Sequence, residues 1–232
     1  MRQWTVVILG LVLACGSWAG AQDISDIVFY DAFESGDTSG WWAPARVGET
    51  GQTTCYDVAG TVIACAGTGQ NGELQTGVAW PNPRFVDNSD GTVTDMLTGL
   101  VWLKDASCAE LGPNGDGTAD WATGLTASQA LASGTCGLTD ASVAGDWRLP
   151  SVNELQSLID YEYYSPALSN AAGTAQWSEG DVFEGVQSSS CWSSTSYAGY
   201  PSLAWYVNLS FGYVNYCDKA GAYYVWPVRG GQ

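Results

Sequence analysis

The stretch AWYVNLSFGYVNY, residues 204–216, alternates large apolar residues with tyrosine, asparagine and serine. One parity holds only large apolar residues, namely Trp205, Val207, Leu209 and Phe211. The other parity holds Tyr206, Asn208 and Ser210, and the rhythm restarts after Gly212. Successive side chains of a strand point to opposite faces of its sheet. The stretch therefore predicts strands whose apolar parity faces a core while the Tyr/Asn/Ser parity covers the other face.

Composition narrows the class of partner. The chain has 232 residues, a formal net charge of −17 and only seven lysines and arginines. Nucleic acid, anionic membranes and highly sulfated glycans are poor partners for such a chain, because each binds through clustered cations. Apolar residues reach 46% and charged residues only 13%, as in a folded domain and not in a disordered acidic tail. The absence of histidine removes Ser-His and Cys-His nucleophile pairs and the commonest zinc ligand.

The N-terminus carries an export signal. Arg2 precedes an apolar run over residues 4–12 that is too short to span a bilayer, and Ala19-Gly20-Ala21 forms a small-x-small site. This pattern predicts a Sec signal peptide over residues 1–21. The alternative is a lipoprotein signal with Cys15 as the acylated residue, although the motif around it fits less well. We expect a secreted, periplasmic or cell-surface protein with no transmembrane segment after cleavage.

Six cysteines remain after cleavage, and an even number in an exported protein indicates disulfides. Many connectivities are open to six cysteines. Proximity along the chain favours the pairs Cys55–Cys65, Cys108–Cys136 and Cys191–Cys217. Buried free thiols are the alternative, whereas a zinc site would need a C-x-x-C spacing that the sequence lacks.

Three segments follow the signal peptide. Residues 22–50 have turn and linker composition without convincing periodicity, so we interpret them as a leader. Residues 51–82 are rich in glycine and threonine and hold the first predicted disulfide. Residues 83–232 form the main domain.

The main domain combines strands and helices. Short strands separated by Asp-Gly and Thr-Gly turns are predicted over residues 84–87, 91–95 and 99–103. A helix is predicted over 121–132, and the capping box Ser151-Val152-Asn153-Glu154 opens a second one with Leu155, Leu158 and Ile159 on one face. Late strands are predicted around Trp192 and over 203–217 and 223–228. Strands, helices and strands again indicate an α+β domain and not a βαβ array.

No cofactor is expected. The closest approach to a calcium loop is formed by Asn114, Asp116, Gly117 and Asp120, but Gly112 stands where the first carboxylate ligand would be. Turn chemistry explains these residues better, and calcium in this loop is the alternative.

The late strands and their loops concentrate tyrosine, asparagine and serine. Tyrosine offers a large amphipathic surface with few torsions to freeze, while serine and asparagine supply adaptable hydrogen bonds. We predict a binding surface for a protein or glycan ligand, formed by Tyr197, Tyr200, Tyr206, Asn208, Ser210, Tyr213, Asn215, Tyr216, Asp218 and Tyr223. The alternative is a structural or self-association module of the cell envelope, with these tyrosines packed between copies of a homo-oligomer. Structural roles are predicted for Trp147, Arg148, Trp192 and Arg229.

Catalysis has few candidates. Glu154, Asp160 and Glu162 are the carboxylates that could form an acid/base pair. The capping box already explains Glu154, and we interpret Asp160 and Glu162 as exposed acids at the end of a helix. We therefore predict no enzymatic activity.

Several segments together resemble the Lcl C-terminal domain family, which is named for a Legionella collagen-like adhesin and was long a domain of unknown function. In family order they are RFVDNSDGTVTDMLTGLVWLKDA (84–106), DWRLPSVNELQSLIDY (146–161), CWSSTS (191–196), AWYVNLSFGYVNY (204–216) and YVWPVRGG (224–231). The resemblance covers the chain from residue 50 or so to residue 232. It implies a C-type-lectin-like fold, with small twisted antiparallel sheets flanked by two helices, in a secreted or surface-attached bacterial protein.

The resemblance also implies an adhesin-like function. The namesake binds sulfated glycosaminoglycans as a trimer, and some related domains are diversified at late-strand positions by retroelements. The few basic residues of this chain argue against a sulfated ligand, and the absent Glu-Pro-Asn and Trp-Asn-Asp motifs argue against lectin chemistry. Both Cys191 and Cys217 depart from the family pattern, which favours their pairing with each other. That pair would also remove the thiols needed for chemistry like that of the formylglycine-generating enzyme family, whose WRLP segment is similar.

Overall fold

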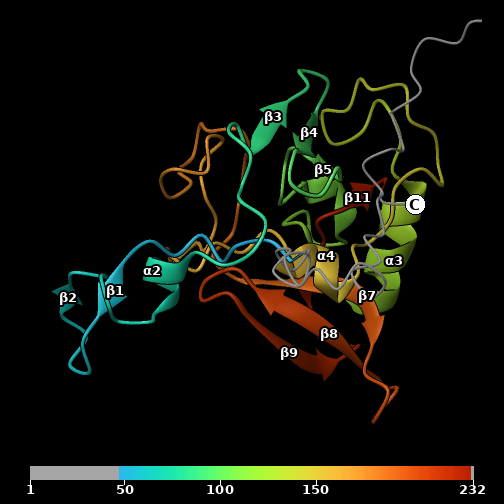
Figure 1. Ribbon diagram of the computed structural model, residues 1–232. Coiled ribbons are helices and arrows are strands. Elements are labelled where there is room, and N and C mark those ends of the chain that lie inside the picture. Colours follow the sequence, from blue (N-terminus) through green and yellow to red (C-terminus); the bar gives the residue numbers. More distant parts are fainter. Residues whose placement is uncertain (1–46, 231–232) are drawn as a thin grey trace, which may run out of the picture. The chain divides into compact units, whose positions relative to one another are not determined.

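The computed structural model describes residues 47–230 of the chain (Figure 1). The predicted signal peptide, residues 1–21, and residues 22–46 of the predicted leader lie outside the described residues. The described residues form three small sheets and a few short helices, so the predicted α+β class is confirmed. Between residues 47 and 230, every helix is too short or too polar to cross a bilayer.

The first elements belong to the predicted disulfide-stapled segment. Strand β1 (Cys55–Tyr56) pairs antiparallel with β2 (Val62–Ile63), and the short helix α2 (Asn71–Leu74) follows. The predicted Cys55–Cys65 disulfide closes this hairpin. The strands are only two residues long, so the disulfide replaces a hydrophobic core that the segment is too small to build.

A four-stranded antiparallel sheet has the order β11-β5-β4-β3. Its strands are β3 (Phe85–Asp87), β4 (Thr92–Asp95), β5 (Val101–Leu103) and β11 (Val228–Arg229). The three strands predicted between residues 84 and 103 are confirmed with slightly shorter bounds. In the β3–β4 turn, Gly91 has a φ of +86°, and a Cβ there would lie 2.5 Å from the carbonyl oxygen of Gly137. The turn therefore requires glycine.

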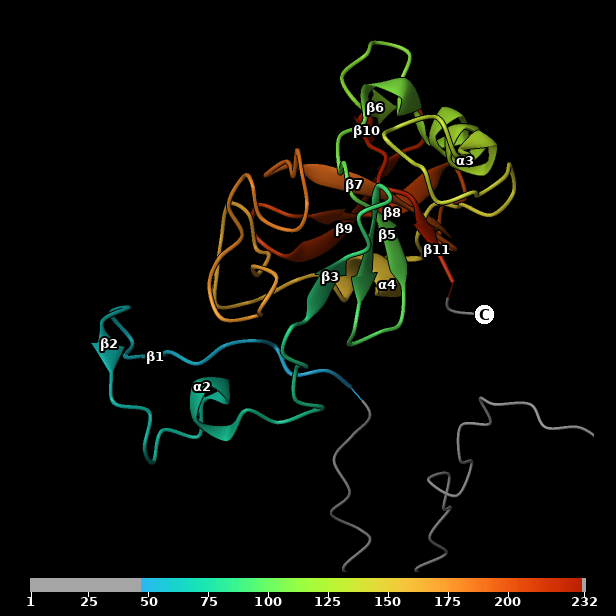
Figure 2. The same cartoon turned by 90° about the horizontal axis from the view of Figure 1, so that it is seen from above.

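A five-stranded sheet has the order β6-β10-β7-β8-β9. Its strands are β6 (Thr118–Ala119), β7 (Ser190–Ser196), β8 (Leu203–Asn208), β9 (Tyr213–Asp218) and β10 (Tyr223–Tyr224). All pairings are antiparallel except that of β10 with β7. The three longest strands, β7, β8 and β9, lie side by side in both views (Figures 1 and 2) and confirm the predicted late strands.

Two helices pack against the five-stranded sheet, as predicted. Helix α3 (Trp121–Ala130) is capped by the side chain of Asp120, and a short 3₁₀ helix, η3 (Ala109–Leu111), precedes it. Helix α4 (Val152–Gln156) begins with the predicted capping box, in which Ser151 and Glu154 exchange side-chain to backbone hydrogen bonds.

Helix α4 is shorter than predicted. It ends at Gln156, and the backbone then makes tighter bonds, from the N–H of Leu158 to the carbonyl of Leu155 and from that of Ile159 to Gln156. Leu155, Leu158 and Ile159 are nevertheless all buried. The predicted apolar face is therefore correct even though the regular helix stops early.

A single hydrophobic core connects the two larger sheets and both helices. Its largest fully buried apolar side chains are Trp102, Trp147, Trp192, Trp226, Phe85 and Phe183. Three of the indole N–H groups donate to buried protein oxygens, those of Ser142, Ala119 and Leu103, as buried polar groups require. Trp147 and Trp192 are among these residues, so their predicted structural role is confirmed.

The third predicted disulfide is wrong. The Cys108–Cys136 bond is present, but Cys191 and Cys217 are both free thiols. Strand β8 lies between the strands that carry them. Strands β7 and β9 are thus two inter-strand spacings apart, about 9.5 Å, which exceeds the Cα separation of about 7 Å that a disulfide can span. The prediction from proximity along the chain failed because the residues between Cys191 and Cys217 include a whole strand, β8, which separates them in the sheet.

Candidate ligand-binding surface

The register of strands β7, β8 and β9 divides the predicted binding residues between two faces. Directly paired residues have side chains on the same face of a sheet. Val207 pairs with Cys191 and Val214, and we call their side the Val207 face. Tyr206 pairs with Trp192 and Asn215, and we call that side the Tyr206 face. The predicted surface is therefore two separate surfaces.

On the Tyr206 face, Tyr206 itself is buried. Its ring lies 5.0 Å from that of Tyr223 and 6.4 Å from those of Trp192 and Tyr213, and only 8% of the residue is exposed. The prediction that Tyr206 faces solvent is therefore wrong, because large neighbours on the same face cover it. Burial, together with the hydrogen bond to Tyr213, raises the pKa of Tyr206.

The side chains of two other predicted residues, Asn208 and Asn215, accept hydrogen bonds from the hairpin backbone. The Oδ1 atom of Asn208 accepts from the N–H groups of Ser210 and Phe211 in the β8–β9 turn, while its amide nitrogen donates to the hydroxyl of Ser190. The Oδ1 atom of Asn215 accepts from the N–H of Tyr216. The structure thus brings Asn208 and Asn215 to the Tyr206 face, where Asn208 makes three internal side-chain hydrogen bonds and Asn215 makes one.

The Val207 face carries four neighbouring aromatic rings at the end of the sheet where β7 connects to β8. They belong to Tyr197, Tyr200, Trp205 and Tyr216, hereafter the aromatic cluster. The rings of Tyr197 and Tyr216 stack at 4.4 Å with an interplanar angle of 10°. The Trp205 indole stands nearly perpendicular to both, at 5.2 and 5.4 Å. Such edge-to-face contacts fix the rings relative to one another. Tyr200 is 67% exposed and Tyr216 is 43% exposed.

Two residues predicted for the core lie at the surface instead. Trp205 is only half-buried and belongs to the aromatic cluster. Phe211 is 65% exposed and stacks on Tyr213. Its parity carries no meaning because β8 ends at Asn208 and Phe211 lies in the turn. Counting pairs outward from that four-residue turn would have placed Trp205 opposite Tyr216 from the sequence alone. Val207 and Leu209 are fully buried, as predicted.

Every lysine and arginine within residues 47–230 is already engaged. Ion pairs join Arg84 to Asp95, Lys104 to Asp87 and Glu184, Arg148 to Glu154, and Arg229 to Asp140. The ammonium of Lys219 lies 3.9 Å from the ring centre of Trp121 and donates to the hydroxyl of Ser196. Exposed Asp218 lies on the same face of the hairpin as the aromatic cluster. Around the aromatic cluster, the described surface therefore presents aromatic rings and a carboxylate to a ligand. It presents no lysine or arginine that is free to bind an anionic ligand.

A family model, the Lcl C-terminal domain, matches residues 91–229, which include both predicted helices and all of strands β4 to β11. The chain belongs to the Lcl C-terminal domain family. No curated protein and no solved structure matches the chain.

The arginines of this Lcl C-terminal domain have structural roles, as predicted for Arg148 and Arg229. The Arg148 guanidinium binds both carboxylate oxygens of Glu154, at 2.8 and 2.6 Å, and donates to the carbonyl of Gly230. Arg148 thus ties the start of α4 to the C-terminal strand. Its hydrogen bond to Glu154 raises the pKa of Arg148.

The two free thiols do not form a catalytic pair. Cys191 is buried, and burial raises its pKa to about 12, so its thiolate is scarce at neutral pH. Cys217 is half-buried on the Tyr206 face, and its hydrogen bond with Tyr223, followed by burial, raises the pKa of Tyr223. The prediction that a disulfide removes these thiols is wrong. Instead, the burial of Cys191 and the strand between the two cysteines keep them from acting together as a reactive thiol pair.

The predicted exposure of Asp160 and Glu162 is also wrong. Asp160 is 1% exposed, and burial raises its pKa to about 6. Glu162 is half-buried and accepts hydrogen bonds from the backbone of Thr53 and from both the backbone and the hydroxyl of Thr54. Both acids lie beside the disulfide-stapled segment: a Cβ on Gly51 would fall 2.3 Å from Asp160 Oδ1. The contact is invisible in the sequence because it joins residues a hundred positions apart.

The acids of the calcium alternative have backbone partners. Asp116 accepts from the N–H and the hydroxyl of Thr118, and Asp120 caps α3. Elsewhere in residues 47–230, Cys108, Glu110 and Cys136 bring three metal-ligating atoms together. Two of these atoms are joined in a disulfide and so are not thiolate ligands.

Proposed function

We propose that this chain is an exported bacterial binding domain of C-type-lectin-like fold, which recognises an uncharged glycan or protein surface in the manner of an adhesin. The observation that carries the proposal is the aromatic cluster, in which mutually fixed rings remain exposed at the surface. Membership of the Lcl C-terminal domain family supports the adhesin-type role.

Exposed, ordered tyrosines suit recognition. Interfaces draw most of their binding energy from a few aromatic anchors, and tyrosine loses little conformational entropy on contact. In the aromatic cluster this loss is reduced further, because Tyr197 and Trp205 already hold the ring of Tyr216. Contiguous exposed aromatic surface on a soluble domain usually serves a contact.

The chemistry of the surface favours an uncharged ligand. A sulfated glycan would need free basic side chains, whereas all five lysines and arginines between residues 47 and 230 have internal partners. The net charge of −17 adds long-range repulsion toward anions. The rings offer their apolar faces to a sugar ring or an apolar side chain, and their hydroxyls offer hydrogen bonds.

Binding is a better proposal than catalysis. The carboxylates considered for catalysis hold structure: Glu154 caps α4, Glu162 binds the backbone of Thr53 and Thr54, and Asp160 is buried. The two disulfides support export, because such bonds persist in oxidising compartments, and the predicted signal peptide provides the route.

Arrays of neutral glycans, sulfated glycans and surface proteins test the proposal with the mature chain. We expect an uncharged ligand whose binding is lost in Tyr200→Ala/Tyr216→Ala and kept in Tyr164→Ala. Tyr164 is the matched control because it is 73% exposed outside the cluster. A sulfated glycan as the strongest ligand, or equal loss in the control, would refute the proposal.

Self-association through the same hairpin is the second candidate. It is favoured by strand β9, an edge strand of the five-stranded sheet that carries a single charged residue, Asp218. Edge strands without protective charges are prone to pair with other chains. If the Tyr200→Ala/Tyr216→Ala variant loses a homo-oligomer while the arrays stay empty for the wild type, this second candidate replaces the first.

A further inference from the structure

The loop between β7 and β8, residues 197–202, carries two rings of the aromatic cluster, those of Tyr197 and Tyr200. Backbone hydrogen bonds shape it: the N–H of Tyr197 donates to the carbonyl of Leu203, that of Tyr200 to Tyr197, and that of Leu203 to Tyr200. A Cβ on Gly199 would lie 3.0 Å from the hydroxyl oxygen of Tyr197, so the loop backbone closes over that ring. The directions of both rings therefore depend on how the loop is held.

Lys219, the residue that follows β9, binds both ends of this loop. Its backbone N–H donates to the carbonyl of Ser202, at 3.1 Å. Its ammonium donates to the hydroxyl of Ser196, at 2.7 Å. Ser196 is the last residue of β7, and Ser202 immediately precedes β8. One residue thus holds the loop both where it leaves one strand and where it enters the next.

Helix α3 holds the ammonium of Lys219 in turn. The nitrogen lies 3.9 Å from the ring centre of Trp121, the first residue of that helix, where the face of the indole attracts a cation. The indole N–H of Trp121 donates to the carbonyl of Ser193 in β7, and its backbone N–H donates to the carbonyl of Lys219. Trp121 also packs against the hydrophobic core. Lys219 therefore joins the loop to a fixed part of the domain.

Lys219 is the exception among the basic residues between residues 47 and 230. The other lysines and arginines of this range form ion pairs with carboxylates, whereas Lys219 forms none. The carboxylate next to it in the chain, that of Asp218, accepts instead from the N–H of Ala220. The contacts of the Lys219 ammonium therefore place the loop and neutralise no acid.

We propose that Lys219 is a positioning residue for ligand recognition: it holds the β7–β8 loop so that the aromatic cluster is already assembled when a ligand arrives. This inference rests on the proposed binding function of the cluster. Tyr197 links the cluster, because its ring pairs with those of Tyr200, Trp205 and Tyr216. Each ring that had to be ordered on binding would weaken the affinity by about two- to tenfold. By ordering the loop beforehand, Lys219 removes this cost.

Four variants of the mature chain test the proposal. Lys219→Met keeps a long side chain but removes the ammonium, and Ser196→Ala removes the hydroxyl that the ammonium binds. Lys219→Arg is the rescue variant, because a guanidinium can donate to Ser196 and lie over the Trp121 ring. Lys104→Met is the matched control, since it removes one positive charge at a partly exposed lysine outside the five-stranded sheet.

The first measurement needs no ligand. NMR of chains with labelled tyrosine reports the ring resonances of Tyr197 and Tyr216, which the stacking of the two rings shifts. Amide hydrogen exchange reports the N–H of Leu203, which closes the loop. We expect Lys219→Met to move both ring resonances toward those of free tyrosine and to speed exchange at Leu203 about tenfold. Lys219→Arg and Lys104→Met should match the wild type, and adding Ser196→Ala to Lys219→Met should change nothing further.

The second measurement titrates each variant over arrays of neutral glycans and surface proteins. On the spots that bind the wild type, we expect Lys219→Met to raise the half-saturating concentration about three- to tenfold, and Lys219→Arg and Lys104→Met to leave it unchanged.

Unchanged ring resonances in Lys219→Met overturn the role of Lys219 alone, and weaker binding with unchanged rings would show that Lys219 touches the ligand directly. Altered rings with unchanged binding, or no rescue by Lys219→Arg, also overturn it. Arrays that stay empty for the wild type overturn the proposed function and, with it, the role of Lys219 in recognition.

Discussion

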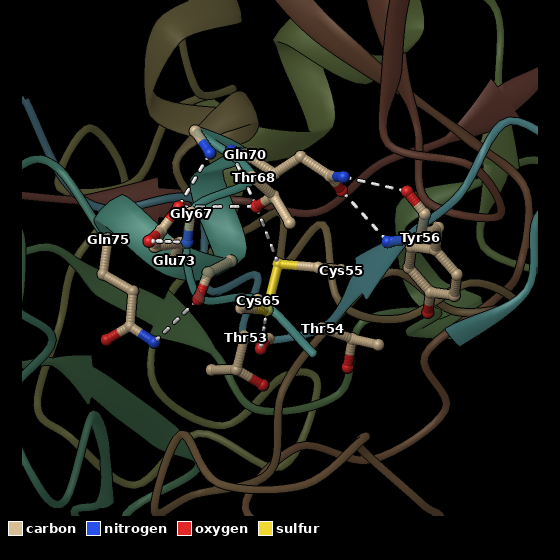
Figure 3. Close-up of a disulfide and its surroundings, with 12 residues drawn as sticks. Thr53, Thr54, Cys55, Tyr56, Cys65, Gly67, Thr68, Gln70, Glu73 and Gln75 are labelled. Carbon is tan, nitrogen blue, oxygen red and sulfur yellow. Dashed lines mark hydrogen bonds between the residues drawn. A yellow bond between two sulfur atoms is a disulfide. The ribbon is translucent and has the colours of Figure 1, made fainter. Parts of the chain in front are cut away.

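Cys191 and Cys217 lie on opposite faces of the five-stranded sheet, with strand β8 between them. Cys191 pairs with Val207 and Cys217 with Ala204, and these two partners have opposite parity on β8. Their thiols therefore remain free, whereas the other four cysteines between residues 47 and 230 are joined in two disulfides, one of which is shown in Figure 3.

Alkylation counts those thiols. We expect two modified cysteines per mature chain after denaturation without reductant, as measured by intact mass. In the native protein, Cys217 should react much faster than Cys191, because burial excludes reagent and raises the pKa of Cys191 to about 12. A mature chain with no free thiol would contradict the strand order.

Replacement of Tyr206 should destabilise the fold although the residue was expected at the surface. Tyr206→Ala removes a ring packed against Trp192, Tyr213 and Tyr223, and we expect a loss of about 3 kcal/mol in the free energy of unfolding. Tyr213→Ala, at a residue 43% exposed on the same face, should cost less than half as much. Urea denaturation of both variants makes the comparison, and equal losses would show that Tyr206 is not buried.

Asp160 should make stability fall as pH rises. Its pKa in the folded protein is about 6 against an ordinary value of 3.8, so folding favours the protonated form. Its contribution is fully present below pH 3.8 and is lost as pH rises through 6. The difference corresponds to about 3 kcal/mol. Urea denaturation should show that the free energy of unfolding of Asp160→Asn rises relative to that of the wild type by about this amount between pH 4 and pH 7. A difference between the two proteins that stays constant across this range would refute the raised pKa of Asp160.

Loss of the Glu162 carboxylate should release the stapled hairpin from the main domain. Glu162→Ala leaves the N–H groups of Thr53 and Thr54 without their acceptor. We expect faster hydrogen exchange at these two residues and little change at the Cys108–Cys136 loop. Glu179→Ala is the control because that carboxylate accepts only from the N–H of Gly185. Unchanged exchange at Thr53 and Thr54 would show that the anchor lies elsewhere.

The features that the sequence predicts well are local. Ser151 and Glu154 exchange side-chain to backbone hydrogen bonds within one helical turn. The four residues from Ser151 to Glu154 are therefore enough to predict the start of α4. The apolar positions Leu155, Leu158 and Ile159 are also correct, because burial depends on which face they share and not on where the regular helix ends.

The features that the sequence misses depend on distant neighbours. Tyr206 is covered by Trp192 and Tyr223 from two other strands. The alternation of residues within β8 cannot predict this burial. Asp160 is buried beside a segment that lies a hundred residues earlier. The predicted burial of Phe211 was wrong for a different reason, because the alternation was continued past Asn208, where β8 ends.

The most direct test of the proposed function compares the two faces of one hairpin. The dissociation constant for the ligand found on the arrays should be measured with Tyr216→Ala on the Val207 face and Tyr213→Ala on the Tyr206 face. Both tyrosines are 43% exposed, so the substitutions remove similar surface. We predict a dissociation constant raised about tenfold or more by Tyr216→Ala and nearly unchanged by Tyr213→Ala. Equal effects of the two substitutions, or the reverse order, would contradict recognition through the aromatic cluster.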